Sequence, residues 1–152
     1  MTSRFFDGAA VNETSLRLTR VIPAPIEAVF QAWIDPALMS HWFFVQETWT
    51  AEVENDLRVG GEFVIKMHTD GGETFTCSGV YYEIEPPTRL VFSWTSYAVT
   101  ESRVTIELRD VEGGTELTLT HEDLVDAIAR NAHGEGWGGC LASLELFFAR
   151  TA

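Results

Sequence analysis

The dominant pattern along the chain is an alternation of apolar and polar residues, which is the period of a half-buried β-strand. It recurs in about six stretches, and residues 45–55 form a less regular candidate for a seventh. The regular stretches are 16–22, 63–67, 75–79, 90–94, 104–108 and 117–121. Because each stretch has one apolar and one polar face, the pattern predicts an antiparallel sheet with one face covered and the other in water.

Glycines mark the connections between these strands. The pairs at 60–61, 71–72 and 113–114 fall between alternating stretches and predict turns. Gly79 lies inside a stretch and indicates a bulge, because an extra residue there would reset the alternation. The sequence therefore leaves open which of the two tyrosines at 81–82 faces inward.

Two short helices are predicted after the first strand. Apolar residues recur at helical spacing over 26–33, directly after Pro25, which suits a first helical turn. Asp35-Pro36 ends this helix, since a residue before proline avoids helical geometry, and Asp35 can cap a second helix. A second short apolar face follows over residues 38–43.

A long helix is predicted at the C-terminal end. Trp137, Leu141, Leu144 and Phe148 lie at i, i+4, i+7 and i+11. Glycines at 134, 136, 138 and 139 precede or open this helix, and each costs about 1 kcal/mol relative to alanine in a helix interior. They indicate either a close backbone approach or a mobile entrance, and residues 122–133 remain a loop or a short helix.

The order of elements predicts an α+β fold. We expect a curved antiparallel sheet of about six to seven strands wrapped around the C-terminal helix, with the two short helices after the first strand. The 152 residues fit one domain, which we place at 15–152. Residues 1–14 are small, polar and aperiodic, so a flexible N-terminal tail is expected there.

Charge and hydropathy exclude several classes of partner. The chain has 23 acidic against 10 basic residues, a net charge of −13, so nucleic acid and anionic membranes would be repelled. No stretch approaches the roughly 18 apolar residues of a membrane span, and the N-terminus lacks the apolar segment of a signal peptide. We therefore expect a cytoplasmic protein that is not inserted in a membrane.

No catalytic or metal-binding motif stands out. The histidines, His41, His68, His121 and His133, show none of the i, i+3 or i+4 spacings of a helical metal pair. Cys77 and Cys140 are 63 positions apart and form no zinc framework, so buried reduced thiols are expected. The sequence therefore predicts neither a metal nor a cofactor.

His121 is the best candidate for a functional polar group. It continues the apolar set of Leu117 and Leu119, and a polar group on an apolar face must find a partner. Two interpretations stay open. The first is a core histidine satisfied by the backbone; the second is a cavity residue that orients a ligand or acts as an acid/base near neutral pH.

Large apolar side chains on the predicted inner face could line a cavity, and each is also a plausible core filler. The candidate lining set, which includes His121, is Trp42, Phe63, Ile65, Met67, Cys77, Phe92, Trp94, Ile106, Leu119, His121, Trp137, Cys140, Leu141 and Leu144.

Several segments together resemble the START-like helix-grip (SRPBCC) superfamily and, within it, the family of activator-of-heat-shock-ATPase homologues. The segments are VIPAPIEAVFQAWIDPALMSHWF, VGGEF, DGGETFTCSGVYYEIEPPTRLVFSW, GGTELTLTH and GEGWGGCLASLELFF. The resemblance extends over residues 15–150, nearly the whole chain, and it is similar to the single-domain bacterial type.

The resemblance implies a deep cavity between the sheet and the long helix. Members bind apolar small molecules or lipids, and some relatives cyclise polyketides. The expected function is thus binding of a small, mostly apolar molecule (a lipid, an aromatic or a polyketide-like compound). Two alternatives stay open: a cyclase or hydrolase acting inside the cavity, and a chaperone-associated interaction module with a stress-response role. The oligomeric state is also open, and a homodimer is one expectation.

Overall fold

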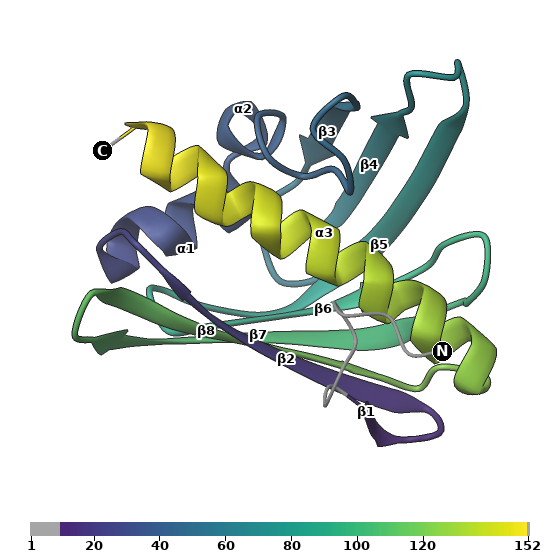
Figure 1. Cartoon of the computed structure of the whole chain (residues 1–152). Coiled ribbons are helices and arrows are strands. Elements are labelled where there is room, and N and C mark those ends of the chain that lie inside the picture. The colour runs from purple at the N-terminus through teal and green to yellow at the C-terminus, as the bar shows by residue number, and fades with distance from the viewer. Residues whose placement is uncertain (1–9, 152) are drawn as a thin grey trace.

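A long C-terminal helix crosses the inner face of an antiparallel sheet, and two short helices flank it on the same side (Figure 1). The structure is a computed structural model and describes residues 10–151. The helices in this part are α1 (Ile26–Ile34), α2 (Pro36–Met39) and α3 (Ala127–Thr151). The strands are β1 (Ala10–Asn12), β2 (Ser15–Ile22), β3 (Thr50–Asn55), β4 (Glu62–His68), β5 (Thr74–Glu85), β6 (Arg89–Trp94), β7 (Ser102–Val111) and β8 (Gly114–Glu122).

The predicted α+β helix-grip architecture is confirmed, with eight strands in the described part instead of six to seven. Their order across the sheet is β1-β2-β8-β7-β6-β5-β4-β3, and every neighbouring pair is antiparallel. The chain thus forms one edge with β1 and β2, crosses to β3 at the far edge, and returns strand by strand to β8. The first long strand, β2, and the last strand, β8, are therefore neighbours in the sheet.

The N-terminal segment departs from the predicted tail. Residues 10–12 form the edge strand β1, which pairs with β2, and the side chain of Asn12 accepts hydrogen bonds from the backbone N–H of Thr14 and the hydroxyl of Ser15. Three exposed residues are too few to show an alternation, so the pattern could not reveal this strand. The rest of the predicted tail, residues 1–9, lies outside the described residues.

The bulge lies beyond Gly79. Gly79 pairs regularly with Phe63, and the register shift falls between Tyr81 and Glu83. A Cβ at Gly79 would lie 1.9 Å from the carbonyl oxygen of Ser93, so the glycine is required by a close backbone approach. Tyr81 therefore faces the core with 3% of its surface exposed, while Tyr82 faces outward with 41% exposed.

The two short helices occur where the sequence predicts them. Asp35 separates α1 from α2, and its carboxylate accepts a hydrogen bond of 2.9 Å from the backbone N–H of Ala37. This contact is an N-cap for α2. The buried face of α1, from Ile26 to Ile34, packs into the core beneath α3.

Helix α3 begins earlier than the sequence suggested. It starts at Ala127, with the Asp126 carboxylate accepting a 2.8 Å hydrogen bond from the backbone N–H of Ala129. The glycines at 134–139 therefore lie within the helix and do not form its opening. A Cβ at Gly139 would lie 2.5 Å from the carbonyl oxygen of Val45, so at this position the glycine allows a close backbone approach.

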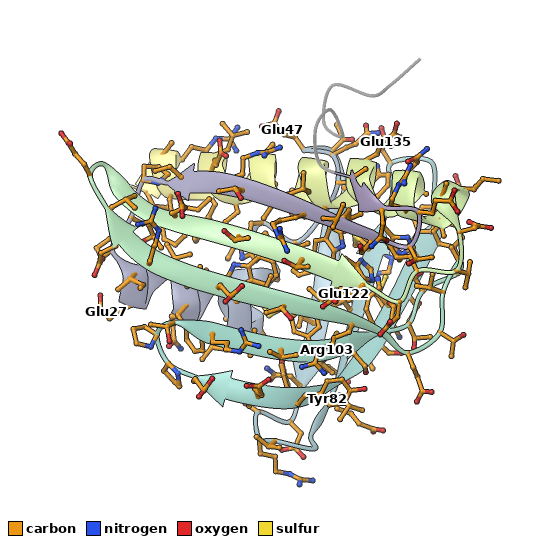
Figure 2. All side chains as sticks on the ribbon, turned by 90° about the horizontal axis from the view of Figure 1, so that it is seen from below. Glu27, Glu47, Tyr82, Arg103, Glu122 and Glu135 are labelled. Atoms are coloured by element: carbon orange, nitrogen blue, oxygen red, sulfur yellow. The ribbon has the colours of Figure 1, made fainter. Side chains whose placement is uncertain are left out.

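The sheet has two unlike faces. The inner face packs against α1 and α3, whereas the outer face carries polar side chains, as Figure 2 shows for Arg103 and Tyr82. The Arg103 guanidinium lies 5.6 Å from the Tyr82 ring centroid. Arg89 on β6 forms an ion pair with Glu107 on the neighbouring strand β7, with 3.1 Å between Nη1 and Oε2. No helix within residues 10–151 is long and apolar enough to cross a membrane.

Candidate functional site

A pocket of about 310 Å³ lies between the N-terminal half of α3 and the β4–β5 part of the sheet. This volume is at the lower end of the range for small-molecule sites. Four segments build its wall: α3, strands β4 to β6, the residues after β6, and the connection between α2 and β3. The lining residues are Phe43, Val45, Trp49, Met67, Thr74, Phe75, Thr76, Cys77, Trp94, Ser96, Tyr97, Ala132, His133, Glu135, Gly136, Trp137 and Cys140.

The structure brings five of the predicted lining residues together on this wall. They are Met67, Cys77, Trp94, Trp137 and Cys140, from one helix and three strands. Trp94 and Trp137 contact each other, with ring centroids 4.8 Å apart, and form the inner end of the pocket. All five side chains are at most a few per cent exposed, so the pocket is an extension of the core.

The other nine predicted lining residues do not border the pocket. They are Trp42, Phe63, Ile65, Phe92, Ile106, Leu119, His121, Leu141 and Leu144, and all of them are buried in the core. Trp42 donates its indole N–H to the carbonyl oxygen of Ala32 at 2.9 Å, which fixes it beneath α1. Most of them fill the other half of the space under α3, while His121 lies beside Trp137 and His133 in the N-terminal half.

A gap of only about 10 Å³ interrupts this filled half, between α1, α2 and strands β4 to β6. Trp33 and Trp94 both border the gap. Their indole N–H groups are buried and have no hydrogen-bond partner within the described residues. At about 10 Å³ the gap is far too small for an organic ligand, in contrast to the pocket.

His121 is fully buried and bonded at both ring nitrogens. Its Nδ1 accepts a 3.0 Å hydrogen bond from the indole N–H of Trp137, and its Nε2 lies 2.7 Å from the hydroxyl of Ser102. The Ser102 hydroxyl in turn donates to the carbonyl oxygen of Trp94 at 2.7 Å. The proton of the neutral ring is thus assigned to Nε2, because Nδ1 acts as the acceptor.

This environment keeps His121 uncharged. Burial, and to a lesser extent the neighbouring His133, lower its pKa to about 3. With both nitrogens occupied and no exposed surface, His121 has no free atom to present to a ligand. Its geometry is that of a satisfied core histidine, and it positions Trp137 on the pocket wall.

His133 is the histidine that reaches the pocket. Its Nδ1 donates to the carbonyl oxygen of Ala129, four residues earlier on α3, at 2.8 Å. Its Nε2 therefore accepts from the hydroxyl of Ser96 at 3.0 Å. Burial lowers the pKa of His133, partly offset by the Ala129 hydrogen bond, so the ring is neutral near neutral pH.

A row of aromatic rings forms the outer rim of the pocket. Trp49 stacks on Phe75 at 5.8 Å, Phe75 lies 5.9 Å from Tyr97, and Tyr97 stacks on His133 at 6.4 Å. The four rings come from four separate segments of the chain. Tyr97 is 77% exposed, so the rim has one large aromatic side chain facing solvent.

The two cysteines of the wall are unreactive in this setting. Burial raises the pKa of the Cys77 thiol to about 12, and burial together with Cys77 raises that of Cys140. Both thiols are free and stay protonated, which is the poor form for nucleophilic attack or metal binding. Within residues 10–151 no group of three metal-ligating side chains comes together.

The predicted lining set contained none of the rim residues and none of the loop residues of the pocket wall. Val45, Ser96 and Tyr97 lie in connections without periodicity, so no pattern identifies them. His133 did carry a signal, because it precedes Trp137 by four residues and Cys140 by seven, which places the three on one helix face. That signal depends on extending the helix back past residue 133.

Comparison with known proteins gives a consistent picture. Residues 23–149 match the family model described as Activator of Hsp90 ATPase homolog 1-like protein. A protein of solved structure from Rhodobacter sphaeroides is 29% identical, with a TM-score of 0.78, covering 90% of this chain and 93% of the other.

Two further solved structures are similar over nearly their whole length. A protein from Chromobacterium violaceum is 28% identical with a TM-score of 0.80, covering 89% of this chain and 96% of its own. An AHSA1 protein from Silicibacter pomeroyi is 26% identical with a TM-score of 0.79, covering 91% and 99%. No curated protein matched the chain.

Proposed function

Because the chain belongs to the Activator of Hsp90 ATPase homolog 1-like family, whose helix-grip fold is typically built around a ligand cavity, we propose that it binds a small, mostly apolar molecule between α3 and the sheet. The observation that carries this proposal is the 310 Å³ pocket lined by aromatic, thiol and thioether side chains. A pocket with this much aromatic surface on its wall is usually a binding site.

Burial of the ligand would supply the affinity. Apolar surface removed from water contributes about 25 cal/mol per Å², less the cost of immobilising the ligand. The pair Ser96 and His133 offers polar atoms at the wall, so one polar group of the ligand could be oriented there. The hydrogen-bonded Trp137 holds the inner end in one conformation.

Native mass spectrometry of the protein as purified from cells tests this proposal, followed by extraction of any bound molecule. We expect a stoichiometric apolar ligand. Gly136 lines the pocket, and a Cβ there would meet no atom within 4 Å, so Gly136→Leu should occupy the space and lower the bound fraction. Ala149→Leu adds the same side chain at an exposed position near the end of α3 and should leave binding unchanged.

The proposal fails if the purified protein is empty and a thermal-shift screen with lipids and aromatic compounds raises the melting temperature of neither the parent nor the Ala149→Leu variant. It also fails if Gly136→Leu retains the full amount of bound ligand, since the ligand would then lie elsewhere.

A second candidate function, hydrolysis of a bound ester, is favoured by one observation. The Ser96 hydroxyl donates to His133 Nε2, and His133 is oriented by the Ala129 carbonyl, which is the arrangement of a nucleophile and a general base. The Ser96 oxygen would attack the acyl carbon while its proton passes to His133, and His133 would then give that proton to the departing alcohol. Water would hydrolyse the resulting acyl-serine, which releases the acid and restores the Ser96 hydroxyl. p-Nitrophenyl acetate is a suitable probe: turnover above background that is lost in Ser96→Ala supports this function, and equal rates for both proteins exclude it.

A further inference from the structure

The charge on the pocket wall is of one sign. Six Phe, Tyr and Trp side chains line the pocket, and within the described residues Glu135 contributes the one carboxylate, with no Lys or Arg on the wall. We propose that the pocket selects a cationic apolar molecule, such as one with an ammonium head group, over an anionic one. This inference rests on the proposed function and adds the chemical class of the ligand.

An anionic ligand would lose its hydration without compensation. A carboxylate or phosphate entering the pocket needs a buried cation or several donors, and an unpaired buried charge is strongly unfavourable. His133 cannot supply positive charge, because burial keeps its ring neutral near neutral pH. The Ser96 hydroxyl is already committed as the donor to His133 Nε2.

A cationic ligand finds favourable partners on the same wall. The faces of aromatic rings carry negative electrostatic potential, so they attract ammonium groups that lie within about 6 Å of the ring centroid. Trp49, Phe75 and Tyr97 form a continuous row at the rim, with successive centroids 5.8 and 5.9 Å apart. A head group at the rim would thus meet several rings while its apolar part extends toward Trp94 and Trp137.

Glu135 adds a formal negative charge to the pocket wall. It is exposed on α3 between His133 and Trp137, and Figure 2 shows it beside this helix. The chain's net charge of −13 gives a long-range potential of the same sign. A local carboxylate and a general field are separable, because salt screens the distant charges more strongly than a close contact.

Three probes of nearly equal shape isolate the head-group charge. Trimethyl(2-phenylethyl)ammonium is cationic, 2-methyl-4-phenylbutan-2-ol is neutral, and 3-phenylpropanoate is anionic. Isothermal titration calorimetry should give dissociation constants in the order cation, alcohol, anion, with the cation at least about tenfold tighter than the anion. Part of the difference in affinity between the cation and the anion should persist when the salt concentration is raised to about 1 M.

A charge-matched pair of variants assigns the effect to the pocket. Glu135→Gln should lower the ratio of cation to alcohol affinity about threefold or more. Glu112→Gln removes the same charge from the turn after β7, at the opposite end of that strand from Ser102, and should leave the ratio unchanged. Trp49→Leu should weaken the cation more than the alcohol.

The outcomes separate the two proposals. If the alcohol binds but the anion binds as tightly as the cation, the selectivity is overturned while the binding function stands. If Glu112→Gln changes the ratio as much as Glu135→Gln does, the general field carries the preference and the assignment to the pocket is overturned. If none of the probes binds, the binding function itself fails for molecules of this size, and the selectivity falls with it.

Discussion

The two halves of α3 cover the same sheet but enclose different interiors. Beneath the C-terminal half, Leu141 and Leu144 belong to the same core cluster as the buried face of α1 and have no exposed surface. Beneath the N-terminal half, the sheet and the helix enclose the 310 Å³ pocket. The difference arises because α1 fills one side with its buried face, whereas the other side has only loop residues to occupy it.

The same contrast separates two neighbouring histidines. The rings of His121 and His133 lie 5.1 Å apart, edge to face. His121 is packed into the core and has no exposed surface, while His133 borders the pocket with 8% exposed. Two histidines that lie close together can therefore have different roles. The packing around Trp137 decides which of them borders the pocket.

The largest difference between the halves should appear on truncating the filled side. Leu144→Ala removes a fully buried side chain from the core, and we expect a loss of about 2–5 kcal/mol in the free energy of unfolding. Urea unfolding measures this change. A loss below about 1 kcal/mol would contradict the claim that this half is tightly packed.

The next test concerns pH. His121 has a pKa of about 3 in the folded protein and an ordinary value of 6.5 when unfolded. Below pH 6.5 the unfolded state therefore binds more protons, so stability falls as the pH falls, by up to about 1.4 kcal/mol per pH unit. His133 acts in the same direction, because burial lowers its pKa as well.

Unfolding in urea between pH 6.5 and 5 checks this slope, since most carboxylates remain ionised there. The free energy of unfolding of the variant His121→Gln should depend clearly less steeply on pH, whatever its value at pH 7. An unchanged slope would mean that His121 is not the sealed group that the structure describes.

Two glycines on α3 should respond in opposite directions. Gly139→Ala places a Cβ 2.5 Å from the Val45 carbonyl oxygen, and we expect a loss of about 1–3 kcal/mol in unfolding free energy. Gly136→Ala adds a Cβ in open space within the helix and should stabilise by about 0.5–1 kcal/mol. Thermal melts compare the two, and destabilisation by Gly136→Ala would show that the helix has no free space beside the pocket.

The smallest effect on stability is expected at the rim. Tyr97 is 77% exposed, so Tyr97→Ala should change the unfolding free energy by less than about 0.5 kcal/mol. The same variant should weaken binding of trimethyl(2-phenylethyl)ammonium, because it removes one ring of the aromatic row. If stability drops and binding is unchanged, the rim is part of the core and the comparison between the two halves fails.

The sequence was sufficient for the fold because the strands have a clear period. Each alternating stretch can bury one face only, and the stripe of Trp137, Leu141 and Leu144 supplies the element that covers it. The short edge strand β1 and the first turns of α3 were missed for lack of such a pattern. The positions of Gly79 and Gly139 were visible, but the atoms that approach them were not.

The pocket was harder to predict than the fold. An inward-facing residue such as Leu119 lines a cavity or fills a core according to what lies across from it, and alternation carries no information about that distance. For His121 the hydrogen-bond partners of its ring, Trp137 and Ser102, come from two other elements, α3 and β7, and only the fold brings them together. The three-dimensional packing, and not the residue type, shows that the candidate polar group is His133 instead of His121.

The distribution of tryptophans gives the protein an internal optical reporter. Of its five indoles, Trp49, Trp94 and Trp137 border the pocket, while Trp33 and Trp42 lie in the filled half. A molecule bound as proposed would change the surroundings of the first three, whereas the other two would provide a constant background of emission. Occupancy should therefore be readable in the intrinsic fluorescence of the unlabelled chain, as a shift of the emission wavelength when the pocket is filled.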